Sequence, residues 1–206
     1  MKNVNTARDF FLYLFATATL YFSAIAFITL LWQYVNHFFP EPSFNYYYSQ
    51  EALNGPMRFA IASLIIIFPI YVAVAWWLSR DLDRNPEKKT FAVRRWLIYI
   101  TLFVTAVTVV VDLVILLNEF LSGDFSARFS LKALSVLVVA AAVFAHYIFN
   151  LRREPGTKVK TKKIIAWTAS IIVAVGVIGA FFLIGTPTAN RDVQFDDKRI
   201  RDLQNI

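Results

Sequence analysis

Long uncharged stretches follow one another along the chain, separated by short charged segments. The five stretches are residues 10–40, 59–79, 96–111 (continuing past Asp112 to 118), 133–151 and 164–190. A helix rises about 1.5 Å per residue, so about 20 apolar residues cross a hydrocarbon core of about 30 Å. The pattern therefore predicts five helices that each cross a membrane.

The predicted crossings are helices rather than strands of a membrane barrel. Lipid offers no partner for unpaired backbone groups, and the stretches lack the alternating pattern of a barrel strand. We therefore expect an all-α integral membrane bundle with spans at about 10–39, 57–79, 96–120, 131–151 and 164–186.

Polar segments outside the spans complete the predicted organisation. Pro40 and Pro42 end the first span, and three tyrosines in the loop at 41–56 favour a position at the lipid headgroups. Residues 187–206 are expected to form a polar external C-terminal segment. This segment stops without a helix cap, which suggests that the natural chain is longer.

Composition supports the membrane class. Hydrophobic residues make up 58% of the 206 residues, and the mean hydropathy is +0.53, which exceeds what a soluble core requires. The chain has no cysteine. Disulfides, thiolate metal sites and thiol catalysis are therefore excluded.

The net charge of +7 comes largely from basic residues beside the spans. They gather before the first span, after the second and after the fourth, so three basic segments share one face of the membrane. By the positive-inside rule that face is cytoplasmic, which places the N-terminus inside and the C-terminus outside. Topology and anionic headgroups explain this charge more simply than a nucleic-acid partner does.

Two carboxylates interrupt the third span. If Trp96 lies at the cytoplasmic boundary, Asp112 is about 24 Å and Glu119 about 34 Å above it. The same arithmetic brings three cations of the second and fourth spans to a similar level: Arg58, Arg128 and Lys132. Five charged groups are therefore expected to form one intramembrane cluster near the outer face.

We expect these charges to neutralise one another. Burial in lipid disfavours the ionised form of a lone carboxylate, whereas a cation within about 4–6 Å favours it. Lys132 and Arg58 are the expected partners of Asp112, and Arg128 is the expected partner of Glu119. The cluster would then tie together the outer ends of the second, third and fourth helices.

Uncharged polar residues follow the same helix faces. Helical spacing aligns Thr101, Thr105 and Thr108 with Asp112, and the first span carries an outer stripe that includes Gln33, Asn36 and His37. In a structural explanation the threonines bond to their own helix carbonyls and the amides bond across helix interfaces. In a functional explanation the stripe lines a hydrated cavity, with Asp112 as a proton or cation site.

Catalytic and metal-binding signals are weak. His37 and His146 lie near opposite faces, so they cannot share a metal ion. The chain has no HExxH motif, nucleophile elbow or glycine-rich phosphate loop. We therefore expect neither an enzyme nor a bound cofactor or metal.

Several segments resemble the DUF5671 family. The most specific are RRWLIYITLF at 94–103 and RFSLKALSVL at 128–137, and RFAIASLIIIFPIYVAVAWWLSRD at 58–81 is also similar. The resemblance implies a bacterial protein that crosses the cytoplasmic membrane several times, with an external C-terminal extension in longer members. It implies no established activity.

Two functions remain open. The favoured one is a structural or partner-binding membrane module that carries an external C-terminal segment, with an envelope protein or a second copy as the partner. The alternative is a small transporter or channel component in which Asp112 handles protons or cations.

Overall fold

Five helices make up the part of the chain that the computed structural model describes, which is residues 6–40, 46–85, 92–123, 126–152 and 159–184. The helices are α1 (Thr6–Phe38), α2 (Tyr46–Arg84), α3 (Ala92–Ser122), α4 (Ala127–Arg152) and α5 (Val159–Ile184). Each is long and apolar enough to cross a membrane, so the all-α prediction is confirmed. The C-terminal segment expected at 187–206 lies outside the described residues.

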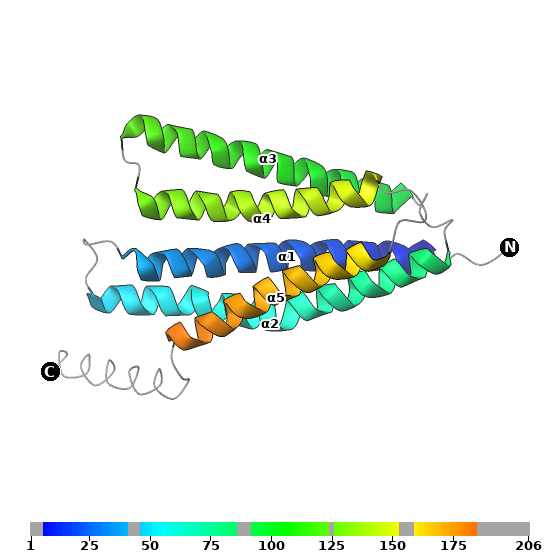
Figure 1. The fold of residues 1–206 in the computed structure, drawn as a ribbon, viewed down its shortest axis with the longest axis horizontal. Coiled ribbons are helices and arrows are strands. Elements are labelled where there is room, and N and C mark those ends of the chain that lie inside the picture. Colours follow the sequence, from blue (N-terminus) through cyan, green and yellow to red (C-terminus); the bar gives the residue numbers. More distant parts are fainter. Residues whose placement is uncertain (1–5, 41–45, 86–91, 124–125, 153–158, 185–206) are drawn as a thin grey trace.

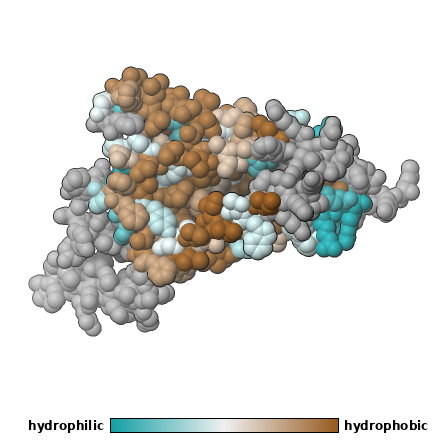
Figure 2. All heavy atoms as spheres, viewed as in Figure 1, coloured by the Kyte–Doolittle hydropathy of each residue, from teal (hydrophilic) through white to brown (hydrophobic). Residues whose placement is uncertain are grey.

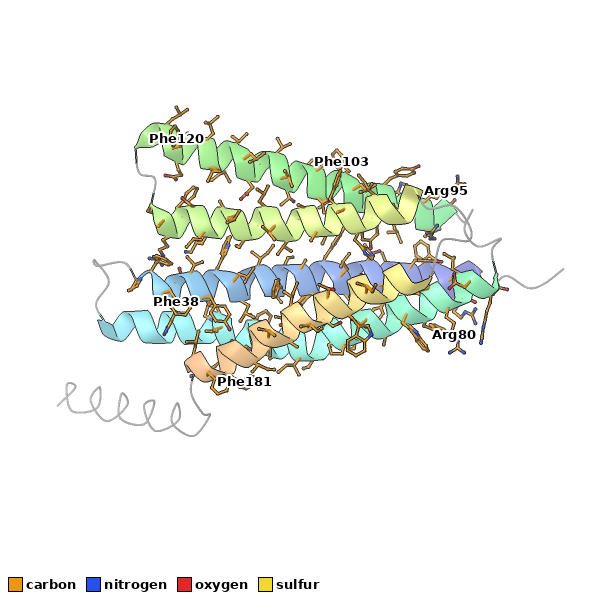
Figure 3. All side chains as sticks on the ribbon, in the orientation of Figure 1. Phe38, Arg80, Arg95, Phe103, Phe120 and Phe181 are labelled. Carbon is orange, nitrogen blue, oxygen red and sulfur yellow. The ribbon has the colours of Figure 1, made fainter. Side chains whose placement is uncertain are left out.

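Each helix runs antiparallel to the one before it in the chain, and α5 is inclined to α1 and α2 (Figure 1). Arg80 and Arg95 lie at the end of the bundle where α1 begins, which we call the basic end (Figure 3). Phe38 and Phe120 lie at the opposite end, where α3 leads into α4, and we call this the hairpin end. Gly123 follows α3 with a φ of +81°, a backbone conformation that residues with a Cβ rarely adopt.

Large apolar side chains cover the outside of the bundle. Phe103, Phe120 and Phe181 are 70%, 61% and 50% exposed, and Figure 2 shows hydrophobic residues over the middle of the visible face with a hydrophilic patch near the basic end. A soluble protein rarely exposes so much contiguous apolar surface. This distribution is the one expected of helices that face lipid.

Helix α1 is the centre of the bundle. It packs against all four other helices, whereas α2 packs mainly on α1 and α5, and α3 and α4 pack mainly on each other and on α1. In Figure 1, α1 lies between α4 on one side and α2 with α5 on the other. The helices α2 and α3 are therefore on opposite sides of α1.

The most tightly packed core joins α1, α2 and α5. Leu30 of α1 and Leu64 of α2 are 0% and 2% exposed, and Ala26, Ala60 and Ala180 surround them. Helix association in lipid depends on close packing and interhelical hydrogen bonds. Small residues at these positions allow the three backbones to approach closely.

A tyrosine fixes α5 onto α1. The hydroxyl of Tyr34 donates a 2.7 Å hydrogen bond to the backbone carbonyl of Gly176. It reaches this carbonyl across Gly179, where an added Cβ would lie only 2.5 Å from the hydroxyl oxygen. The absence of a side chain at Gly179 is therefore a condition for the contact.

The start of α2 differs from the sequence expectation. The loop expected at 41–56 is shorter, because α2 begins at Tyr46 and contains Gly55 and Pro56. Proline lacks the N–H that would bond to the carbonyl four residues earlier. That carbonyl belongs to Ala52, in a polar part of the helix beyond the apolar span at Gly55–Arg84, where water can satisfy it.

We predict that Gly179→Ala loosens α5 by displacing the Tyr34 hydroxyl from the Gly176 carbonyl. The loss of unfolding free energy in detergent should be about 1 kcal/mol. In a Tyr34→Phe background the added methyl group meets no hydroxyl, so Gly179→Ala should then lower the free energy of unfolding much less.

Gly176→Ala is the matched control. Its added Cβ would meet Phe27 at 3.4 Å, an ordinary contact, so its effect should be smaller and independent of Tyr34. Equal effects of Gly179→Ala in the wild-type and Tyr34→Phe backgrounds would contradict the proposed packing.

Candidate functional site

The threonines of α3 are satisfied within their own helix. The hydroxyls of Thr101, Thr105 and Thr108 donate to the carbonyls four residues earlier at 2.8, 2.8 and 2.9 Å. Thr29 of α1 does the same to Ile25 at 2.9 Å. These bonds remove the cost of placing hydroxyl groups in hydrocarbon, as the structural explanation of the stripe requires.

Thr101 also lies in a group of hydroxyls that come from four helices. We call this group the hydroxyl cluster, and its members are Thr17 and Tyr21 of α1, Tyr71 of α2, Thr101 of α3 and Tyr147 of α4. The Tyr21 hydroxyl donates to Thr101 at 2.9 Å, and Thr101 is 0% exposed. Tyr147 lies near Thr17, Thr101 and Tyr71.

The sequence analysis missed the hydroxyl cluster. Its members are far apart in the chain, since 80 positions separate Tyr21 from Thr101. Thr17 and Tyr21 are four residues apart and so share one face of α1, which was the available signal. The Tyr21–Thr101 hydrogen bond ties α1 to α3 in the half nearer the basic end.

Towards the hairpin end, α1 and α4 are joined by a charged hydrogen bond. The Nε and Nη2 groups of Arg128 donate to the side-chain carbonyl of Asn36 at 3.0 and 2.8 Å. Asn36 in turn donates to Gln33, which is 8% exposed, at 3.3 Å. Both amides of the predicted α1 stripe therefore lie at this interface, next to a predicted cation.

One helical turn away, Trp32 and Lys132 connect the same two helices. The indole Nε1 of Trp32 donates to the backbone carbonyl of Lys132 at 3.1 Å. The Lys132 ammonium lies 5.9 Å from the centre of the Trp32 ring, within the range of a cation–π interaction. We call the pairs Asn36–Arg128 and Trp32–Lys132 the α1–α4 contact.

The expected ion pairs of the charge cluster are not formed. Among the described residues, the side chains of Asp112, Glu119 and Arg58 form no hydrogen bond or ion pair. The predictions that Asp112 pairs with Lys132 or Arg58, and Glu119 with Arg128, are therefore wrong for this structure. The rise along a helix gave the height of each charge but not its position around the bundle. Helix α1 keeps Arg58 of α2 away from α3. Arg128 and Lys132 of α4 face Asn36 and Trp32 of α1 instead of α3.

His37, the remaining predicted site residue, belongs neither to the hydroxyl cluster nor to the α1–α4 contact. It is exposed, and its ring meets Phe38 edge-on at 5.4 Å. Across the residues that the structure describes, no three His, Cys, Asp or Glu side chains are grouped so that they could hold a metal ion.

A buried carboxylate at the basic end has a structural explanation. Asp9 is 4% exposed and forms an ion pair with Arg8 at 3.4 Å. It lies in the first turn of α1, where the helix dipole favours negative charge. Trp77 and Asp81 of α2 line the same depression, so this end of α1 is held close to the end of α2.

The fold and these interhelical contacts define an integral membrane protein with five candidate spanning helices. The chain belongs to the family described as "Domain of unknown function (DUF5671)", whose model matches residues 9–147. The match runs from the first turns of α1 into α4, so it contains the hydroxyl cluster and the α1–α4 contact. Neither a curated protein nor a solved structure matches the chain.

We predict measurable coupling between Arg128 and Asn36. The double-mutant cycle Arg128→Ala and Asn36→Ala should give an interaction energy of about 1 kcal/mol in detergent unfolding, because a charged donor loses its acceptor. The matched cycle of Arg128→Ala with Glu119→Ala should be additive. The reverse result, with coupling to Glu119 and none to Asn36, would contradict the geometry.

We also predict that Tyr21→Phe and Thr101→Val each destabilise the bundle and that their effects are not additive. Removing either hydroxyl breaks the same cross-helix bond, whose strength in a membrane protein is about 0.6 kcal/mol. Thr108→Val is the control, because the Thr108 hydroxyl bonds only to its own helix in this structure. A larger effect of Thr108→Val than of Thr101→Val would count against the cluster.

Proposed function

We propose that the protein is a non-enzymatic, partner-binding module of the bacterial cytoplasmic membrane. The observation that carries the proposal is Asp112, a half-buried carboxylate within an apolar helix that has no ion-pair or hydrogen-bond partner among the described residues. A charged side chain at the centre of a membrane helix costs about 2.5–3.5 kcal/mol on insertion scales. A partner that supplies a cation offsets this cost.

The segment of α3 that carries Asp112 has no fully buried residue. The buried residues of α3 are Leu97, Ile98, Thr101 and Thr105, and the described residues beyond Thr105 up to Gly123 are half-buried or exposed. Val110, Val114 and Leu117 are about as exposed as the lipid-facing residues of α5. Asp112 follows Thr105 and Thr108 on one face of α3, so it lies on the half-buried side of this segment, opposite these exposed residues.

The charge distribution supports the proposed orientation. Arg80 and Arg95 lie together at the basic end (Figure 3), and the basic segments of the sequence flank the spans on this side. By the positive-inside rule the basic end faces the cytoplasm, so Asp112 lies in the half of the membrane nearer the outside.

The second candidate is a transporter or channel component that uses Asp112. Thr108, which shares the stripe with Asp112, is the observation that favours it. Against it stands the hydrogen bond of Thr108 to its own helix, which leaves this hydroxyl less available to an ion. We therefore rank partner binding first.

The test compares the wild-type chain with Asp112→Asn. We expect wild-type protein, taken from cell membranes in lipid nanodiscs, to have a native mass above that of the 23.6 kDa chain. Asp112→Asn should lower the fraction of this heavier species, because the amide carries no charge to pair. Glu119→Gln, at another unpaired carboxylate of the same helix, should lower it less.

Ion flux distinguishes the two candidates. In vesicles that contain a pH-sensitive dye, we expect the same rate of proton flux with wild-type protein, with Asp112→Asn and without protein. Proton flux that is present in the wild type and lost in a folded Asp112→Asn variant would establish the transporter instead. A mass of one chain under all conditions would remove the support for a partner.

A further inference from the structure

The last turns of α2 carry two exposed arginines on one side of the helix. Arg80 and Arg84 follow Trp76 by four and eight residues, so the three side chains form one stripe, which we call the basic-end stripe. In the described part of the chain, neither arginine forms a hydrogen bond or an ion pair. Two guanidinium groups are therefore open to an anion.

The basic-end stripe begins where the apolar part of α2 ends. Trp76 and its neighbour Trp77 are 59% and 46% exposed, and tryptophan is enriched at the boundary between hydrocarbon and lipid headgroups. Arg80 and Arg84 lie about 6 and 12 Å beyond Trp76 along the helix axis. Since arginine has a long flexible stem, both guanidinium groups can reach the headgroup layer at the basic end.

The indole of Trp76 orders the Arg80 guanidinium. The Cζ atom of Arg80 lies 5.3 Å from the centre of the Trp76 ring, within the range of a cation–π interaction. This contact provides no hydrogen-bond acceptor. The N–H donors of Arg80 therefore remain for a phosphate, which arginine binds through two parallel hydrogen bonds.

The positive charge of the stripe is not neutralised within the described chain. Like charges four residues apart on a helix repel each other, so an anion between Arg80 and Arg84 is stabilising. Asp81 lines the depression beside Arg8 of α1. Asp83 forms an ion pair with neither arginine of the stripe.

An exposed apolar track leads from the stripe towards the middle of the membrane. Ala62, Ile66, Pro69 and Ala73 follow one another at steps of four, three and four residues, and Trp76 comes three residues later. All four are exposed. Acyl chains can therefore lie along the same side of α2 that presents the arginines.

We propose that the basic-end stripe binds the headgroup of an anionic phospholipid, with the phosphate between Arg80 and Arg84 and the acyl chains along the apolar track. The track favours a lipid over a soluble phosphate, because it continues the site into the hydrocarbon. A headgroup with a net negative charge is favoured over a zwitterionic one, which brings its own cation to the arginines. Arg80 lies at the basic end (Figure 3), away from the level of Asp112, so the site does not depend on the proposed partner.

Fluorescence quenching at one position tests the site, since the chain has no native cysteine. Ala73→Cys carries a fluorophore on the track, in vesicles of equal phosphatidylglycerol and phosphatidylcholine with brominated acyl chains on one lipid or the other. From the quenching we expect phosphatidylglycerol to be enriched about fivefold next to the fluorophore. The matched control is a fluorophore on Ala142→Cys, at an exposed alanine in the half of α4 nearer the basic end, where the enrichment should be much smaller.

Charge variants supply the second arm. Arg80→Gln and Arg84→Gln should each lower the enrichment at Ala73, and the double variant should abolish it, because glutamine carries no charge to the phosphate. Asp83→Asn should raise it by removing a nearby negative charge. Trp76→Leu should lower it without any change of charge, because Arg80 then loses the ring that orders it, and Trp76→Phe should lower it less.

Three results would overturn the inference. The first is equal quenching by the two brominated lipids at Ala73 in the wild-type background. The second is an enrichment that is as large at Ala142. The third is an enrichment that persists in a folded Arg80→Gln and Arg84→Gln double variant, since it would then reflect the charge of the whole basic end.

Discussion

Helix α1 packs against the other four helices in a medium that offers no water to polar groups, and this constraint organises the bundle. Thr17, Thr19 and Ser23 of α1 are buried, and each donates to a carbonyl of its own helix. Tyr21, Tyr34 and Asn36 instead form hydrogen bonds with neighbouring helices. The central helix is therefore held by hydrogen bonds as well as by packing.

The polar contacts of α1 with α3 and α4 lie at two levels. The Tyr21–Thr101 bond of the hydroxyl cluster joins α1 to α3 in the half nearer the basic end, whereas the α1–α4 contact lies towards the hairpin end. At that second level α4 is bound to α1, and α3 contributes no bond to the contact. This difference explains why the buried residues of α3 end at Thr105 and why Asp112, on the same face of α3, is only half-buried.

The match to the family ends within α4, so the shared part contains both levels of polar contact. Helix α5 lies beyond it and is held differently, by the Tyr34 bond to Gly176 and by the core around Leu30 and Ala180. Its outward surface is apolar throughout the described residues from Ile171 to Phe182. The fold thus consists of a four-helix unit with a fifth helix packed on α1 and α2.

The sequence by itself determined the five helices, because a run of about 20 apolar residues has no other stable structure in lipid. It also gave the height of each charge, since the rise along a helix is constant. Tertiary structure alone decided which groups meet. Arg128 binds Asn36 rather than Glu119, and α1 separates Arg58 from Asp112, because the order of helices around a bundle depends on packing between segments distant in the chain. For the same reason the hydroxyls of Tyr21, Thr101 and Tyr147 form a cluster that no local spacing reveals.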